Sequence, residues 1–124
     1  MSAALVLFAH GARDPRWAEP FQRLLLSTRA RLPQVRVELA FLELMEPGVP
    51  QLAAQLAAEG VQSVTLVPVF LGQGGHLRRD LPLIVEECRQ AHPTLEFTIV
   101  APIGEDDAVL EAIAGYCAAA LPLK

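Results

Sequence analysis

Two histidines and a glutamate lie at even spacing along the chain. The interval from His10 to Glu43 equals the interval from Glu43 to His76. Imidazole and carboxylate groups suit first-row divalent metals such as cobalt, nickel, iron and zinc, and three protein ligands leave coordination positions open for a reaction. A second carboxylate, Glu46, lies close behind Glu43, and the sequence leaves open which of the two would act. The pattern indicates a reactive metal site.

Arginines accompany both histidines. Arg13 and Arg16 follow the first histidine, and Arg78 and Arg79 follow the second. Guanidinium groups bind carboxylates through two parallel hydrogen bonds, so they favour an anionic ligand. Because the chain is acidic overall, with a net charge of −4, this clustering indicates a polyanionic substrate beside the metal.

Glycines flank both histidines as well. Gly11 follows His10, and Gly74 and Gly75 precede His76. Glycine either supplies backbone angles with positive φ or lets a flat ligand approach the backbone closely. Both explanations remain open for these three positions.

The elements that must position these residues follow from the apolar pattern. Four apolar runs predict strands at residues 3–9, 35–42, 63–71 and 95–101. Helical periodicity and capping residues predict helices at 15–32, 49–59, 80–91 and 105–121. Asp80 is the expected cap of the third helix, with residues 72–76 as a flexible loop before it. Pro68 cannot donate to a sheet ladder, which predicts a bulge or a local edge there.

Strands that alternate with helices predict an α/β fold, a parallel sheet with helices on both faces and right-handed crossovers. Ligands of such sheets bind beyond the carboxyl ends of the strands. His10, Glu43 and the segment that ends in His76 each follow one of the predicted strands. We therefore expect their side chains to converge within about 10 Å, a range set by short metal–ligand bonds.

Composition excludes several functional classes. The 124 residues fit one domain, are 52% apolar and carry 19% charged residues, which excludes disorder. The apolar fraction exceeds what one small domain readily hides, which suggests an oligomer. The apolar runs are too short to span a bilayer, no signal peptide is evident, and the negative charge disfavours nucleic-acid binding. Two cysteines without a paired motif favour a reduced, cytoplasmic protein.

Three segments together resemble the sirohydrochlorin chelatase family. Residues 7–15 (LFAHGARDP) are similar to its H-G-[ST]-R-x-P opening, although Ala12 replaces the usual hydroxyl residue. Residues 41–47 (FLELMEP) resemble its F-L-E-x-x-x-P segment. Residues 67–82 (VPVFLGQGGHLRRDLP) resemble its P-x-F-L-x-x-G-x-H-x-x-x-D-[IL]-P block.

The resemblance implies a chelatase-like three-layer sandwich with a four-stranded parallel sheet, in the short form that has one unit over residues 1–124. It places the metal-binding histidines at His10 and His76 and the acidic partner at Glu43. It implies a cytoplasmic homodimer with the site in a cleft near the partner. The implied reaction is insertion of a divalent cation, Co²⁺ first and Fe²⁺ or Ni²⁺ next, into sirohydrochlorin on the path to cobalamin or sirohaem.

In that reaction His10 and His76 present the metal to one face of the macrocycle and accept pyrrole protons, since neutral imidazole can do both. Glu43 neutralises charge, while Arg13, Arg78, Gly74 and Gly75 bind the tetrapyrrole. No further cofactor is expected.

Two rival functions remain. One is a metal or tetrapyrrole carrier without catalysis on the same fold. The other is phosphoryl transfer through His10, although Ala9 stands where histidine phosphatases have arginine.

Overall fold

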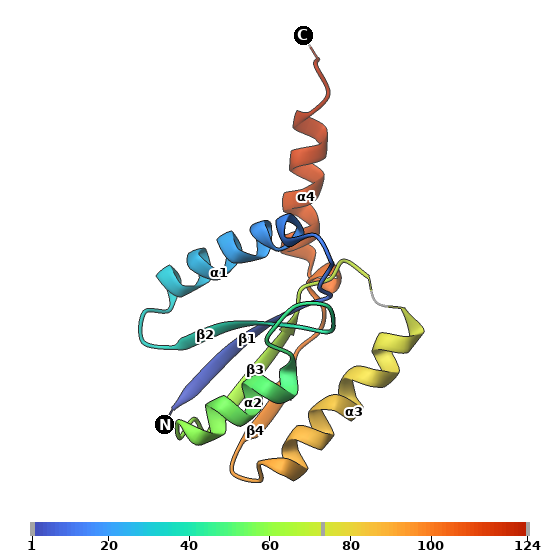
Figure 1. The fold of residues 1–124 in the computed structure, drawn as a ribbon. Helices are drawn as coiled ribbons and strands as arrows, with labels where there is room; N and C mark the ends of the chain where they lie inside the picture. The colour runs from blue at the N-terminus through green and yellow to red at the C-terminus, as the bar shows by residue number, and fades with distance from the viewer. Residues whose placement is uncertain (1, 73, 124) are drawn as a thin grey trace.

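A four-stranded parallel sheet organises the chain (Figure 1). The computed structural model describes residues 2–72 and 74–123, apart from the side chain of His76. The strands follow the order β2-β1-β3-β4, which confirms the predicted fold class. Their bounds are β1 (Ala3–Ala9), β2 (Arg36–Phe41), β3 (Ser63–Pro68) and β4 (Glu96–Ile99). The helices are α1 (Glu19–Arg31), α2 (Val49–Ala58), α3 (Gly75–Ala91) and α4 (Asp107–Ala119), with short 3₁₀ turns η1 (Pro15–Ala18) and η2 (Ile103–Glu105).

Helices cover the two faces of the sheet unequally. On one face α2 and α3 enclose the main core, in which Phe8, Leu56 and Leu66 are almost fully buried. On the other face η1 and α1 cover β1 and β2, and Phe21 and Leu25 pack against this second core. The sequence of β1 is apolar because both of its faces are covered.

The last helix packs on neither face. Figure 1 shows α4 leaving the carboxyl edge of the sheet and pointing away from the body of the molecule. No residue of α4 is buried. None of the helices within residues 2–72 and 74–123 is long and apolar enough to cross a membrane.

The start of α3 differs from the sequence prediction. The helix begins at Gly75 rather than behind Asp80, so His76 belongs to its first turn and not to a flexible loop. Leu77, Leu81 and Val85 are buried at helical spacing, and this packing continues the helix through Pro82, which has no N–H to donate.

The local edge predicted at Pro68 is confirmed. The ladder between β3 and β4 ends at the pair Leu66–Ile99, so Pro68 has no partner on that side.

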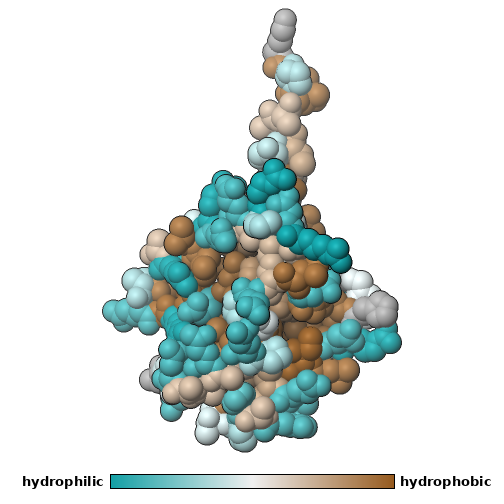
Figure 2. All heavy atoms as spheres, in the orientation of Figure 1, coloured by the Kyte–Doolittle hydropathy of each residue, from teal (hydrophilic) through white to brown (hydrophobic). Residues whose placement is uncertain are grey.

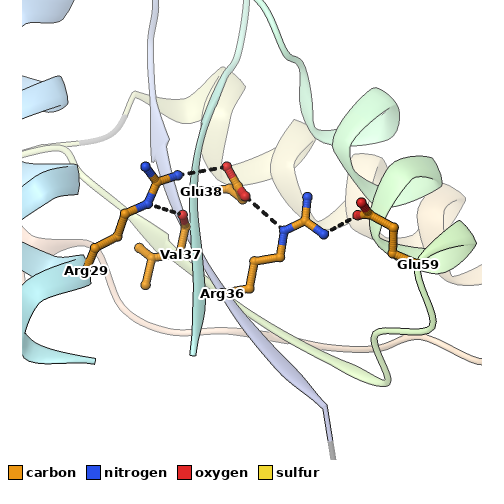
Figure 3. Close-up of polar contacts among 5 residues, drawn as sticks. All are labelled: Arg29, Arg36, Val37, Glu38 and Glu59. Atoms are coloured by element: carbon orange, nitrogen blue, oxygen red, sulfur yellow. Dashed lines mark hydrogen bonds and ion pairs between the residues drawn. The ribbon is translucent and has the colours of Figure 1, made fainter. Parts of the chain in front are cut away.

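A network of ion pairs ties the opposite end of the sheet together (Figure 3). Arg29 donates to the Val37 carbonyl at 2.9 Å and to Glu38 at 3.2 Å. Arg36 donates to Glu38 at 2.9 Å and also pairs with Glu59, and both carboxylates raise its pKa. These arginines join α1, β2 and the end of α2, and they are structural.

Candidate functional site

His10 occupies the centre of the carboxyl edge. It follows β1 directly, and β1 lies between β2 and β3. The residue is exposed to solvent. Its ring stacks at a tilt against Phe70, with the ring centroids 4.6 Å apart. Phe70 is buried just beyond β3, so an apolar surface orients one side of the imidazole while the other remains accessible.

The backbone at Glu43 is bound to the backbone at His10. Leu42 N–H donates to the Ala9 carbonyl at 2.9 Å, and Glu43 N–H donates to the His10 carbonyl at 3.1 Å. Gly11 has a φ of 91°, and a Cβ there would overlap the carbonyl oxygen of Glu43. Glycine at position 11 is therefore required by positive φ and by close approach together.

A hollow of about 320 Å³ opens beside this junction. Arg13 and Gln22 line it from one side, and Leu44, Met45 and Glu46 line it from the other. A tight turn shapes the second wall, because Met45 N–H donates to the Glu43 carbonyl at 2.8 Å across Leu44, whose φ is 65°. Positive φ is uncommon for a non-glycine residue and costs free energy.

The two arginines behind His10 differ in their partners. The Arg16 side chain donates to the Asp14 carboxylate at 2.8 Å, and Asp14 also accepts from the Arg16 backbone N–H at 2.9 Å. These bonds hold the pKa of Asp14 below its ordinary value. Arg13 is exposed, and the described residues give its side chain no hydrogen bond or ion pair. Arg13 is therefore the one available to an anionic ligand.

The third element of the edge is the first turn of α3. Gly74 caps this helix with φ −73°, and Arg78 N–H donates to its carbonyl at 3.1 Å. A Cβ at Gly74 or Gly75 would meet nothing within 4 Å, and neither residue has positive φ. The explanation of these two glycines by positive φ is thus wrong, while open space at this backbone leaves room for a ligand.

The structure brings His10 and Glu43 together at the backbone and places α3 after the neighbouring strand β3. The side chain of His76 lies outside the described residues, so its convergence with His10 and Glu43 stays a prediction. Among the side chains that the structure does describe, no group of three or more His, Cys, Asp or Glu residues could hold a metal ion.

The residues that form the walls of this edge are not predictable from the sequence pattern. Phe70 lies in the apolar run at residues 63–71, and its contact with His10 depends on the order of the strands in the sheet. Gln22, Leu44 and Met45 carry no motif that points to the hollow. One usable signal existed for Phe70, because it follows the end of β3 as His10 follows the end of β1.

Comparisons with known proteins give a family match and several similar proteins. The model of the CbiX family matches residues 4–118. The chain is 36% identical over 89 residues to a sirohydrochlorin cobaltochelatase of Methanococcus aeolicus, covering 70% of this chain and 62% of that protein. The chain thus spans less than two thirds of this relative's length.

Two solved structures are similar in fold. One is a putative cobalamin biosynthesis CbiX protein from Marinobacter aquaeolei VT8, with TM-score 0.83 and 30% identity over 94% of this chain and 95% of that one. The other is SirB from Bacillus subtilis with Fe³⁺, with TM-score 0.79, 25% identity and coverage of 93% of this chain and 46% of that one.

Proposed function

The chain belongs to the CbiX family, and from that membership we propose that it is a chelatase that inserts a divalent cation into sirohydrochlorin. Cobalt is the proposed metal, because the similar protein of Methanococcus aeolicus is named a sirohydrochlorin cobaltochelatase. The observation that carries the proposal is the exposed imidazole of His10, held at the carboxyl edge by its backbone contact with Glu43.

We propose that His10, His76 and Glu43 receive the incoming metal ion. His10 is accessible on the side away from Phe70. Glu43 is exposed on the adjacent loop, and His76 begins the helix that follows the next strand. A carboxylate beside imidazoles lowers the cost of holding a dication.

We propose that the tetrapyrrole binds across the same edge. Its peripheral carboxylates pair with Arg13 beside the hollow and with Arg78 on α3. The ring lies over Gly74 and Gly75, where the backbone is open. Binding on several sides positions and distorts the macrocycle, and positioning of this kind lowers reaction barriers.

Insertion replaces two pyrrole protons by one metal ion and strips water from that ion. Neutral imidazole accepts a proton once it has released the metal, so His10 and His76 serve both steps in turn. Glu43 stabilises the imidazolium that forms. Protonation of the imidazoles at low pH removes both functions.

We propose that the protein acts as a cytoplasmic homodimer on the path to cobalamin, with sirohaem as the alternative product. The free thiols of Cys88 and Cys117 support a reducing compartment. The exposed apolar side chains of α4 support self-association.

An absorbance assay of sirohydrochlorin with Co²⁺, Fe²⁺, Ni²⁺ or Zn²⁺, with the protein limiting, tests the reaction. Many turnovers per protein with Co²⁺ are expected. Tight binding with at most one equivalent converted would instead identify a carrier. Phosphate monoester hydrolysis without metal insertion would contradict the proposal.

A further inference from the structure

Leu44 has a backbone conformation that leucine rarely adopts. Within residues 2–72 and 74–123 it is the one non-glycine residue with positive φ, at 65°. Met45 N–H donates to the Glu43 carbonyl at 2.8 Å, so the three residues form a γ-turn of the rare and strained kind, with Leu44 at its centre. Glycine or asparagine would adopt this conformation at a lower cost in free energy.

The packing of the Leu44 side chain does not explain this cost. Leu44 is 58% exposed and belongs to neither hydrophobic core. A single exposed leucine is ordinary, and Figure 2 shows apolar residues between hydrophilic ones on the visible face of the body. An exposed leucine in a strained backbone is not ordinary, because such strain is concentrated at functional sites and ligand contacts. We therefore looked for a ligand contact at Leu44.

A second exposed leucine lies on the other side of His10. Leu44 is the third residue after β2 and Leu71 is the third residue after β3, and β1 lies between these strands. Leu71 is 61% exposed. Gly104 holds its backbone, because Gly104 N–H donates to the Phe70 carbonyl at 2.9 Å and a Cβ at Gly104 would overlap the Leu71 carbonyl. The chain thus fixes a leucine on each side of the exposed imidazole.

Both leucines directly follow a residue that contacts His10. Glu43 N–H donates to the His10 carbonyl, and the ring of Phe70 stacks against the ring of His10. Leu44 also lines the hollow together with the exposed Arg13. The carboxyl edge therefore combines an imidazole at its centre, a leucine on each side, and an arginine beside one of these leucines.

A tetrapyrrole combines the same three chemistries. Its nitrogens are polar and central, its ring body is flat and apolar, and its carboxylates are peripheral. The proposed function assigns His10 to the metal and Arg13 to a carboxylate, but it gives the ring body only the open backbone at Gly74 and Gly75. Contact between apolar side chains and the ring body removes apolar surface from water and stabilises the complex.

We propose that Leu44 and Leu71 are specificity residues that contact the apolar ring body of the tetrapyrrole on two sides of His10. The strained turn is retained because it places a large apolar side chain beside Glu43. A free metal ion or a small carboxylate has no ring body, so the two leucines select for a macrocycle. The inference rests on the proposed function, but it concerns binding of the ring and not metal insertion.

Fluorescence titration with metal-free sirohydrochlorin tests both contacts on the full chain. Leu44→Asn and Leu71→Asn keep a branched side chain of similar size and make it polar. Leu26→Asn is the matched control, because Leu26 is 64% exposed on α1 and does not line the hollow. Leu44→Met keeps the position apolar and nearly preserves its volume.

Leu44→Asn and Leu71→Asn are each expected to weaken the affinity for sirohydrochlorin about tenfold. More than half of each leucine is exposed in the free protein, and the ring removes this surface from water. Leu44→Met should stay within about threefold of wild type, and Leu26→Asn should leave the affinity unchanged. Calorimetric titration with Co²⁺ alone should give the wild-type affinity in all four variants.

Urea unfolding separates a ligand contact from a structural role. Leu44→Asn is expected to unfold at a higher urea concentration than wild type, because asparagine tolerates positive φ better than leucine does. Leu26→Asn is expected to unfold at a lower concentration, because asparagine is the poorer helix former. At Leu44, stability should thus rise while affinity falls, and a structural role cannot produce this combination.

Wild-type affinity for sirohydrochlorin in either Leu44→Asn or Leu71→Asn would overturn the inference. A loss of affinity in Leu44→Asn that accompanies a loss of stability would overturn it as well. If Leu44→Asn does not fold, the affinity of Leu71→Asn alone decides.

Co²⁺ insertion by the wild type, measured on the same sample, tests the proposed function separately. Weaker binding by the variants of a protein that inserts no metal contradicts only the chelatase proposal. Metal insertion by a protein whose variants bind sirohydrochlorin normally contradicts only the contacts proposed for the two leucines.

Discussion

The carbonyl oxygen of His10 accepts a hydrogen bond from the backbone N–H of Glu43 at 3.1 Å. This bond extends the pairing of β1 and β2 by one step beyond the last strand residues, Ala9 and Phe41. The two candidate ligands are therefore attached to a single backbone unit, and their separation is set by the sheet rather than by two independent loops. Gly11 permits this junction because no other residue fits under the Glu43 carbonyl.

Substitution of Gly11 is expected to destabilise the fold. Gly11→Ala places a Cβ against the Glu43 carbonyl in a backbone with φ 91°. We expect the free energy of unfolding to fall by about 2–4 kcal/mol, from strain and overpacking together. Urea unfolding followed by circular dichroism measures the change.

Gly74→Ala is the matched control. Gly74 has φ −73° and open space around it, so the unfolding free energy of Gly74→Ala should fall by no more than about 1 kcal/mol, the usual cost of alanine at a helix N-cap. Equal destabilisation by both substitutions would show that the junction at Gly11 is not the tight contact described above.

Arg13 and Arg16 are expected to differ in their effect on tetrapyrrole binding. Arg13 is exposed beside the hollow, whereas Arg16 is held by Asp14. Arg13→Ala should weaken sirohydrochlorin binding by about 1.5–3 kcal/mol, roughly ten- to a hundred-fold, if it makes a two-bond contact with a carboxylate. Fluorescence titration without metal measures the affinity.

Arg16→Ala is the control, because it removes the same positive charge from the same segment. It should change the affinity for sirohydrochlorin little. A larger loss of affinity with Arg16→Ala than with Arg13→Ala would show that Arg16, rather than Arg13, binds the anionic ligand.

The cap at the start of η1 is expected to depend on pH. The Arg16 side chain and backbone N–H lower the pKa of Asp14, so the ionised carboxylate is favoured in the folded protein. The contribution of Asp14 to stability is thus present above its unfolded pKa and is lost as pH falls through the lower folded value. In a carboxyl NMR titration, the pKa of Asp14 should lie below the ordinary value of an aspartate, and Arg16→Ala should raise that pKa. An unchanged midpoint in that variant would mean that the pair does not persist in solution.

The strands and the polar residues that follow them were predictable from sequence, because both depend on the order of residues within short segments. His10 and Glu43 directly follow apolar runs, and parallel strands bring such positions to one edge. The start of α3 was not predictable in this way. Asp80 and Pro82 have the spacing of a helix start. The burial of Leu77, which lies before them, shows that α3 already begins one turn earlier.

The position of α4 was also beyond sequence reasoning. Its composition predicts a helix that needs covering, and alternation with strands predicts one packed on its own sheet. The direction in which it leaves depends on the contact of Gly104 with the loop after β3, which is a tertiary feature.

The most direct test of the central claim is the initial rate of Co²⁺ insertion into sirohydrochlorin by the double variant His10→Ala, His76→Ala, corrected for uncatalysed insertion. Position 10 is exposed at a strand end and contributes little to the core, so we expect the variant to fold and still bind sirohydrochlorin. We predict that its rate falls to the uncatalysed level, because both imidazole ligands and proton acceptors are gone. If the folded double variant inserted Co²⁺ at the wild-type rate, the assignment of these histidines as the metal-handling site would be contradicted.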